Sequence, residues 1–233
     1  GDVARNTIVR LTSEEHAIDE RARAVAALVD VDFDLAAARA AALLQHMTDG
    51  DDCSLVIRAF LSREGGSRKL AEAVAAASPS KDVAKQALRH MYSEGRSDAE
   101  LTNVLGSIAG LDADPQPLSP PQVSRLAERV AAEGDAARGE MVFRRADLSC
   151  LKCHALNKAG GQIGPDLSAL GASSPVEYII NSISNPDQQI KEAFTTRVVV
   201  TSEGRVHQGI VVDRTAERLV LKTADGGHVT IPQ

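Results

Sequence analysis

Cys150-Leu151-Lys152-Cys153-His154 is the most informative stretch of this 233-residue chain. Two cysteines separated by two residues and followed at once by a histidine form the attachment signature of c-type haem. Each thiol can add to one vinyl group of the porphyrin, and the histidine can then donate an imidazole nitrogen to the iron. We therefore expect one covalently bound haem c on Cys150 and Cys153, with His154 as the proximal iron ligand.

Two other uses of such a cysteine pair remain open. A structural zinc site would need a second pair of Cys or His ligands at comparable spacing, and no such pair follows His154. A thioredoxin-like redox pair should lie between a strand and a helix, where the histidine would be incidental.

Composition and charge exclude several classes of protein. Lys and Arg total 26 and Asp and Glu total 32, so the net charge is −6, and no Lys/Arg-rich run is present. Nucleic acid is therefore not an expected partner. No apolar run approaches the roughly 20 residues of a membrane helix, so we expect no membrane span.

Three cysteines are too few for a disulfide framework. Cys53 lies in an apolar segment and is expected to be a buried thiol, with an interchain bridge as the alternative.

The first half of the chain predicts a mainly helical domain over residues 1–111. Short polar turns separate alanine-rich segments, and residues 1–11 resemble the tail of an upstream segment. Thr12–Glu15 and Ser97–Glu100 have the pattern of capping boxes, which start helices. The predicted helices cover residues 12–29, 33–47, 53–61, 67–77, 78–95 and 97–108. Stacked antiparallel pairs of this rhythm resemble a HEAT-like or armadillo-like solenoid, and an irregular helical bundle fits the rhythm equally well.

Residues 112–121 are rich in proline and predict a semi-rigid linker. The following domain, residues 122–233, begins with a helix that Ser119 and Pro120 open and that ends near residue 132. Another helix is expected over residues 175–183. Segment 195–233 then changes to short β-rich runs separated by Gly-containing turns, which predicts a small antiparallel meander. The predicted strands cover residues 195–201, 206–213, 218–223 and 228–231.

Gly134–Phe143, the haem signature and Gly164-Pro165-Asp166-Leu167 together resemble the first two-thirds of a class I cytochrome c. More narrowly, residues 134–233 are similar to the haem-binding domain expanded in planctomycete-type and verrucomicrobial bacteria. That domain commonly lies C-terminal to helical repeats in large secreted proteins. The helical region here matches only in general character.

The resemblance implies roles for individual residues. The Pro165 carbonyl would accept the other imidazole N–H of His154, which fixes the tautomer and the basicity of the ligand. Leu167 would pack on the porphyrin face, and Gly139 and Phe143 would share a helix face that a C-terminal helix crosses. Further apolar candidates for the wall of the site are Leu148, Leu151, Ile163, Leu170 and Ile179.

The distal side of the iron departs from the family pattern. A class I cytochrome supplies a distal methionine late in the chain. The methionines of this chain all precede the signature, at Met47, Met91 and Met141. The distal segment is therefore expected to be cut off, supplied by another chain, or absent. His207 and His228 are the remaining distal candidates, and Lys191 and Met141 are weaker ones, although a lone strand histidine is more often a surface residue.

The resemblance implies a c-type cytochrome domain that transfers single electrons as a module of a larger redox protein. Haem c is attached outside the cytoplasm, and Gly1–Arg5 is not a signal peptide, so we expect a processed or excised fragment of a periplasmic or otherwise extracytoplasmic protein. The expected partner is a redox protein or a fused dehydrogenase domain.

No catalytic motif is found, which favours an electron-transfer module over an enzyme. The alternatives are a haem-based small-ligand sensor with an open iron position and a helical interaction scaffold with an accessory haem. A haem peroxidase would need a distal acid–base constellation that the sequence lacks.

Overall fold

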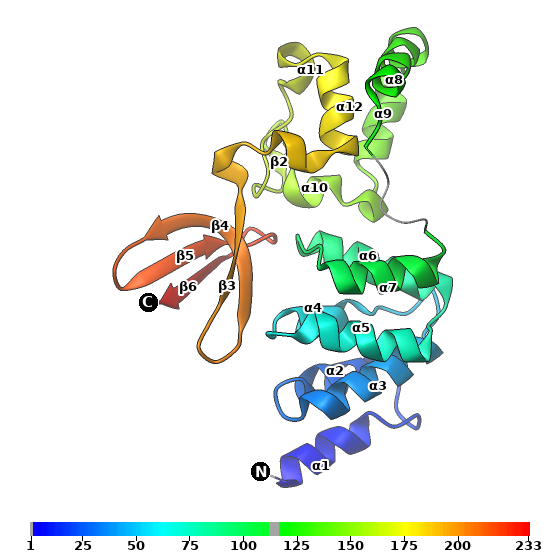
Figure 1. The fold of residues 1–233 in the computed structure, drawn as a ribbon, viewed down its shortest axis with the longest axis vertical. Helices are drawn as coiled ribbons and strands as arrows, with labels where there is room; N and C mark the ends of the chain where they lie inside the picture. Colours follow the sequence, from blue (N-terminus) through cyan, green and yellow to red (C-terminus); the bar gives the residue numbers. More distant parts are fainter. Residues whose placement is uncertain (1, 112–116) are drawn as a thin grey trace. The chain divides into compact units, whose positions relative to one another are not determined.

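The computed structural model of the chain describes residues 2–111 and 117–233 (Figure 1). The expectation of a mainly helical chain with a small antiparallel sheet near its C-terminus is confirmed. The chain divides into two compact units. The first unit is Gly1–Ala113 with Val199–His207, and the second unit is Asp114–Val198 with Gln208–Gln233. Half of the predicted linker, residues 112–116, lies outside the described residues.

The first unit is built from helices that follow one another with short turns between them. They are α1 (Asp2–Leu11), α2 (Ile18–Leu28), α3 (Phe33–His46), α4 (Ser54–Leu61), α5 (Gly66–Ala77), α6 (Lys81–Ser93) and α7 (Ala99–Ala109). Each of the six helices expected from the sequence is present, most of them with ends within a few residues of the predicted ones. Hydrophobic spacing and turn residues are local signals, which is why they locate these elements well.

The start of the first predicted helix is wrong. The Thr12–Glu15 pattern predicts a capping box, but the Thr12 hydroxyl donates to the carbonyl oxygen of Val9, 2.7 Å away, at the end of α1. Residues 2–11 form a helix instead of a tail, and Thr12 closes its last turn. α2 therefore begins later, after an N-cap Ala17 that makes no side-chain hydrogen bond.

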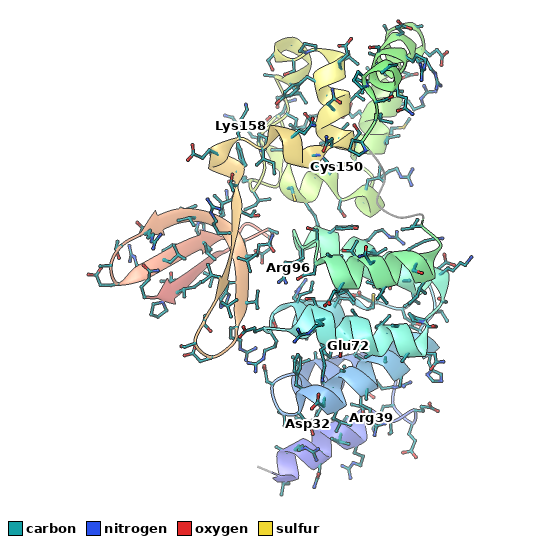
Figure 2. The ribbon with its side chains drawn as sticks, in the orientation of Figure 1. Asp32, Arg39, Glu72, Arg96, Cys150 and Lys158 are labelled. Atoms are coloured by element: carbon teal, nitrogen blue, oxygen red, sulfur yellow. The ribbon has the colours of Figure 1, made fainter. Side chains whose placement is uncertain are left out.

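The second predicted capping box, Ser97–Glu100, is also absent. Asp98 is the N-cap of α7, and its side chain makes no capping hydrogen bond. The guanidinium of Arg96 donates to both carboxylate oxygens of Asp98, at 2.9 and 2.7 Å, and to the carbonyl oxygen of Leu61 at 2.8 Å. The ion pair thus occupies the carboxylate that would otherwise cap the helix; Arg96 is labelled in Figure 2.

The helices of the first unit pack in two rows. α2, α4 and α6 contact one another in succession, as do α3, α5 and α7, and the pairs α2·α3, α4·α5 and α6·α7 join the rows. Many of the buried positions are alanines, which allow helices to approach closely because helix separation depends on the side chains at the contact. Phe60 is fully buried, and its ring stacks on that of Phe33 with 5.8 Å between the centroids.

Cys53 is a buried free thiol at the N-cap of α4, as expected. Burial raises the pKa of the Cys53 thiol to about 12, with a further contribution from the neighbouring Asp52 charge. The thiol is therefore protonated at neutral pH, and its environment is that of a core residue.

Residues 199–207 belong to the first unit although they are far from its helices in sequence. The Val206 N–H donates to the Ser62 carbonyl oxygen and the Glu64 N–H donates to that of Gly204, each at 2.9 Å. These bonds lie on either side of an antiparallel backbone bridge, which pairs Arg205 with Arg63 of the turn after α4.

The second unit contains the remaining helices and most of the strands. Its helical elements are α8 (Pro120–Glu133), α9 (Ala136–Phe143), η1 (Ala146–Leu148), α10 (Cys150–Cys153), α11 (Leu170–Ser173), α12 (Val176–Ser184), η2 (Pro186–Gln189) and η3 (Glu192–Phe194). Ser119 and Gln122 form the expected start of α8, with the Ser119 N–H donating to the Gln122 side-chain oxygen at 2.8 Å. Val123 and Ala127 of α8 pack against Ile180 of α12, which makes a small apolar cluster.

Two antiparallel sheets complete the described chain. A two-residue ribbon joins β1 (Ala155–Leu156) to β2 (Ala159–Gly160). The larger sheet has the order β3-β4-β5-β6, so sequence neighbours lie side by side as the predicted meander requires. Its strands are β3 (Thr196–Val200), β4 (Val206–Arg214), β5 (Arg218–Lys222) and β6 (His228–Pro232). Among the described residues, no helix is long and apolar enough to cross a bilayer.

Candidate haem-attachment site

The signature occupies a single helical turn followed by an extended residue. α10 covers Cys150–Cys153 and follows Ser149, whose φ of 56° is left-handed. The His154 N–H donates to the Cys150 carbonyl oxygen at 3.0 Å, and His154 itself is extended. Residues three apart on a helical turn are neighbours on its surface. The two cysteines are therefore presented from the same side of one turn, which suits attachment to one planar group; Figure 2 labels Cys150.

Both signature cysteines are free thiols that are partly exposed. Burial raises the pKa of the Cys153 thiol, and the positive charge of Lys152 partly opposes this rise. Cys153 is therefore a neutral thiol at physiological pH. Neither side chain is committed to a disulfide, so both sulfurs are available for a thioether bond.

The His154 imidazole is oriented by a backbone carbonyl. Its Nδ1 atom lies 3.0 Å from the carbonyl oxygen of Pro165. That oxygen can only accept, so Nδ1 carries the proton and donates it. In the neutral ring the other nitrogen, Nε2, is then the unprotonated one, which is the form that binds a metal. This is the contact that the resemblance implies, while the role of His154 at an iron stays a prediction.

Three glycines form a loop that lies directly against the signature. The N–H groups of Gly161 and Gly164 donate to the carbonyl oxygens of Leu151 and Cys153, at 2.8 and 2.7 Å. A Cβ atom on Gly161 would lie 1.8 Å from the Lys152 carbonyl oxygen, and one on Gly164 would lie 2.9 Å from the His154 ring. Only glycine permits this approach. No role is expected for Gly161 from the sequence, although the three closely spaced glycines at 160, 161 and 164 are a signal that could have indicated one.

Strand β1 directly follows His154, and a tight turn links it to β2. Its central residues, Asn157 and Lys158, have φ values of 51° and 64°, as a two-residue hairpin with right-handed strand twist requires. The Asn157 N–H donates to the Ser168 hydroxyl at 2.6 Å, and the Lys158 N–H donates to the Asp166 carboxylate at 3.0 Å. Side-chain and backbone hydrogen bonds from Ser168, and the backbone bond from Lys158, hold the pKa of Asp166 below its usual range.

The predicted wall residues differ in burial. Ile163 is buried, whereas Leu151, Leu167, Leu170 and Ile179 are half-buried and Leu148 is exposed. Leu151 is part of the signature, and its carbonyl oxygen accepts the Gly161 N–H. The Leu167 N–H donates to the carbonyl oxygen of Ala155, the residue after the signature, at 2.9 Å. Leu170 begins α11 and Ile179 lies in α12. Several apolar side chains of this region therefore keep accessible surface.

The distal candidates lie on separate elements. His207 is half-buried in β4 and belongs to the first unit, whereas His154 belongs to the second. His228 is exposed on β6, opposite Lys222 of β5, and Met141 on α9 is 66% exposed. Lys191 is exposed between η2 and η3. The assignment of His207 as a distal ligand stays a prediction.

The sheet is tied to the glycine loop by one long side chain. Lys222 Nζ donates to the Gln162 carbonyl oxygen at 2.7 Å. Lys222 is also the strand partner of His228 in the β5–β6 pairing. The sequence gives no hint of this contact, because the two residues are 60 positions apart.

Gly139 and Phe143 lie in α9, which buries none of its residues. Gly139 has nothing within 4 Å of the position that a Cβ atom would take, and Phe143 is half-buried. The helix crossing that the resemblance implies at these two residues stays a prediction.

The other uses of the cysteine pair receive no support. In the part of the chain that the structure describes, no three His, Cys, Asp or Glu side chains gather as a metal site, whereas structural zinc takes four ligands. The pair follows α9 and η1, and a thioredoxin-like pair would follow a strand. A search of protein-family models returns no match for this chain, and a search of curated proteins returns none either.

Proposed function

We propose that this chain is an extracytoplasmic c-type cytochrome module that carries single electrons through one haem c. Cys150 and Cys153 would hold the porphyrin through thioether bonds, and His154 would bind the iron. The observation that carries the proposal is the hydrogen bond from His154 Nδ1 to the Pro165 carbonyl oxygen, which leaves Nε2 for a metal. The two cysteines that precede His154 lie on one helical turn, and both are free thiols.

The residues around the signature fit such a group. The glycine loop packs against the backbone of Cys150–His154 and donates hydrogen bonds to it. The segment is therefore held in one conformation before a haem is attached. Leu151 and Leu167 are half-buried beside it and can cover a porphyrin face with apolar surface. When bound, the haem supplies the redox chemistry. The protein residues attach it, orient its proximal ligand and exclude water from its apolar surface.

The architecture of both units supports a finer proposal for the fold. We infer that the first unit is a HEAT-like array, because two rows of helices joined in successive pairs match that arrangement. The second unit would be a class I cytochrome c-like domain with a β meander. A redox partner protein, or a fused dehydrogenase domain, would deliver or remove the electron, and the setting would be periplasmic or otherwise extracytoplasmic.

The test is covalent haem attachment. The chain is produced together with a c-type maturation system and examined by haem staining after denaturing electrophoresis and by acid–acetone extraction. The wild-type chain should retain its haem through both, and Cys150→Ala with Cys153→Ala should abolish retention. Cys53→Ala is the matched control, because it removes the third thiol from a different unit and should leave attachment intact. Complete extraction of haem from the wild-type chain contradicts the proposal.

A second candidate is a small-ligand sensor with an open iron position. The positions of the methionines favour it. All methionines precede His154, and Met141 is exposed on α9. A haem-loaded chain should then lack the far-red methionine–iron band and bind carbon monoxide when reduced. His207→Ala should leave the spectrum unchanged if the site is open and alter it if His207 is the ligand. A methionine band in this chain alone would exclude the sensor.

A further inference from the structure

Asp166 lies between two residues that hold the signature in place. On one side the Pro165 carbonyl oxygen accepts the His154 Nδ1–H. On the other side the Leu167 N–H donates to the Ala155 carbonyl oxygen at 2.9 Å. The backbone of Asp166 also forms a parallel bridge with Ala155. Any shift of Asp166 along the chain direction would therefore move the Pro165 carbonyl relative to the imidazole.

Both oxygens of the Asp166 carboxylate accept hydrogen bonds from the two segments that surround the site. Oδ2 accepts the Lys158 N–H at 3.0 Å. Oδ1 accepts the Ser168 N–H at 2.8 Å and also the Ser168 hydroxyl. The Ser168 oxygen in turn accepts the Asn157 N–H at 2.6 Å. Two consecutive N–H groups of the β1–β2 turn are thus paired with Ser168 and Asp166 (Figure 2 labels Lys158).

The turn whose N–H groups donate these bonds is conformationally unfavourable. Asn157 and Lys158 both have positive φ, and a lysine carries a steric cost in the left-handed region that an asparagine tolerates better. Such a conformation persists only where the surroundings determine it. The bond from Lys158 to the Asp166 carboxylate is a charge-assisted hydrogen bond and offsets this cost.

We propose that Asp166 is a positioning residue, which holds the Lys158 turn and Ser168 so that the Pro165 carbonyl stays opposite His154 Nδ1. The inference rests on the proposed function for its consequence at the iron, because the fixed tautomer presents Nε2 as the ligand. The hydrogen bonds of the Asp166 carboxylate go to Lys158 and Ser168 rather than to the imidazole or the thiols. It acts through backbone geometry.

The principal variant is Asp166→Asn in the full chain. An amide has one acceptor oxygen where the carboxylate has two, so it cannot serve the Lys158 and Ser168 N–H groups in the same way. Asp213→Asn is the matched control, since Asp213 pairs with Arg218 at 2.9 Å on β4 and β5, in the same unit. Ser168→Ala is a milder second variant, which removes only the hydroxyl link between Asp166 and Asn157.

Two readouts apply to the chain without haem. In Asp166→Asn the Lys158 amide should exchange its hydrogen roughly ten- to hundredfold faster than in the wild type, because a hydrogen bond to a charged group is lost. The ¹⁵N shifts of the His154 ring should show a loss of the Nδ1–H tautomer. Ser168→Ala should act in the same direction with a smaller change, and Asp213→Asn should change neither readout.

A rescue variant separates positioning from general loop support. Lys158→Gly removes the steric cost of positive φ, because glycine adopts this region freely. Introduced into Asp166→Asn, it should restore part of the Nδ1–H tautomer. In the haem-loaded chain, Asp166→Asn should raise the reduction potential, because a weaker Nδ1–H bond makes the imidazole a less basic ligand.

The outcomes are distinguishable. An unchanged His154 tautomer in Asp166→Asn overturns the inference, even if Lys158 exchange accelerates, because Asp166 would then support only the turn. A wild-type chain that takes up no covalent haem contradicts the proposed function, while the tautomer in the haem-free chain still decides the role of Asp166.

Discussion

The first and second units hold their structure by different means. The helices of the first unit share one continuous core, and its largest buried side chains, such as Phe60, Leu44 and Leu105, are almost completely inaccessible. In the second unit the apolar cluster of α8 and α12 centres on three buried residues, Val123, Ala127 and Ile180. Exposed large apolar side chains of the second unit include Met141, Leu148, Ile183 and Ile190.

The contrast indicates what specifies each unit. Burial of apolar area stabilises the first unit, and this contribution is distributed over many side chains. Around the signature the second unit relies on close glycine contacts and on hydrogen bonds made by Asp166, Ser168 and Pro165. Directional polar contacts of this kind set geometry well and contribute modestly to net stability. The second unit is therefore the one whose stability should respond to a bound apolar group.

The largest expected effect concerns haem attachment. Covalent haem should strongly raise amide protection in residues 150–168 and leave protection in α2–α7 unchanged, because only the second unit gains apolar contacts. Hydrogen exchange of the wild-type chain with and without haem measures both regions in one experiment. Equal gains in both units would mean that the core of the first unit also depends on the haem, and the comparison would fail.

Removal of a core ring should be the most damaging single substitution in the first unit. Phe60→Ala should cost about 3–5 kcal/mol in the free energy of unfolding, because a fully buried aromatic ring leaves a cavity. Ile180→Ala in the second unit should cost less, about 2 kcal/mol, since the surrounding cluster is small and can relax. Urea unfolding followed by circular dichroism provides the values.

Leu55→Ala on the same helix as Phe60 is the matched control. Its side chain is 39% exposed, so the loss should be within about 1 kcal/mol. A cost for Ile180→Ala that equals that of Phe60→Ala would show that the two units have equally tight cores.

A smaller effect is expected at the segment of residues 199–207 that docks in the first unit. Gly204 has a φ of 72°, and its carbonyl oxygen accepts a hydrogen bond from the Glu64 N–H. Gly204→Ala should destabilise this contact by about 1 kcal/mol, because an alanine is strained at positive φ. Exchange of the Glu64 amide should accelerate accordingly. Gly226→Ala, at a φ of 82° in the turn before β6, should leave the Glu64 amide unaffected.

The ion pair beside this segment should matter less still. Arg205 donates to the Asp30 carboxylate at 2.8 Å, and both side chains are well exposed. Asp30→Asn should cost at most about 1 kcal/mol and become undetectable at high salt, because exposed pairs are screened. A larger effect that high salt abolishes would indicate that the segment is held by charge rather than by its backbone hydrogen bonds.

The smallest effect is a dependence on acid. The pKa of Asp166 is held below its ordinary value of 3.8, first of all by the Ser168 hydroxyl. A carboxyl with a depressed folded pKa contributes stability that is present above the unfolded value and lost as pH falls through the folded one. Protection of the Lys158 amide should therefore be constant down to about pH 4 and decline below it. A decline that begins near neutral pH would point to a different group.

Most helix and strand boundaries could be predicted because the signals for them are local. Helices α3 to α7 and the strands of the meander follow hydrophobic spacing and turn residues within a few positions. The failures have local causes of another kind. Thr12 and Asp98 each have a competing partner, Val9 and Arg96, that a pattern of residue types does not reveal.

The sequence by itself predicts cofactor attachment at Cys150, Cys153 and His154, because two thiols and an imidazole at that spacing suit one haem. Their geometry was decided by the tertiary structure. The loop from Asn157 to Ser168 closes on the signature through bonds between residues eight to eleven positions apart, at a turn that lysine does not favour by itself. The docking of residues 199–207 on the turn after α4 joins positions 140 apart. Every residue except proline carries the same backbone N–H group, so only the folded chain determines which acceptor each N–H meets.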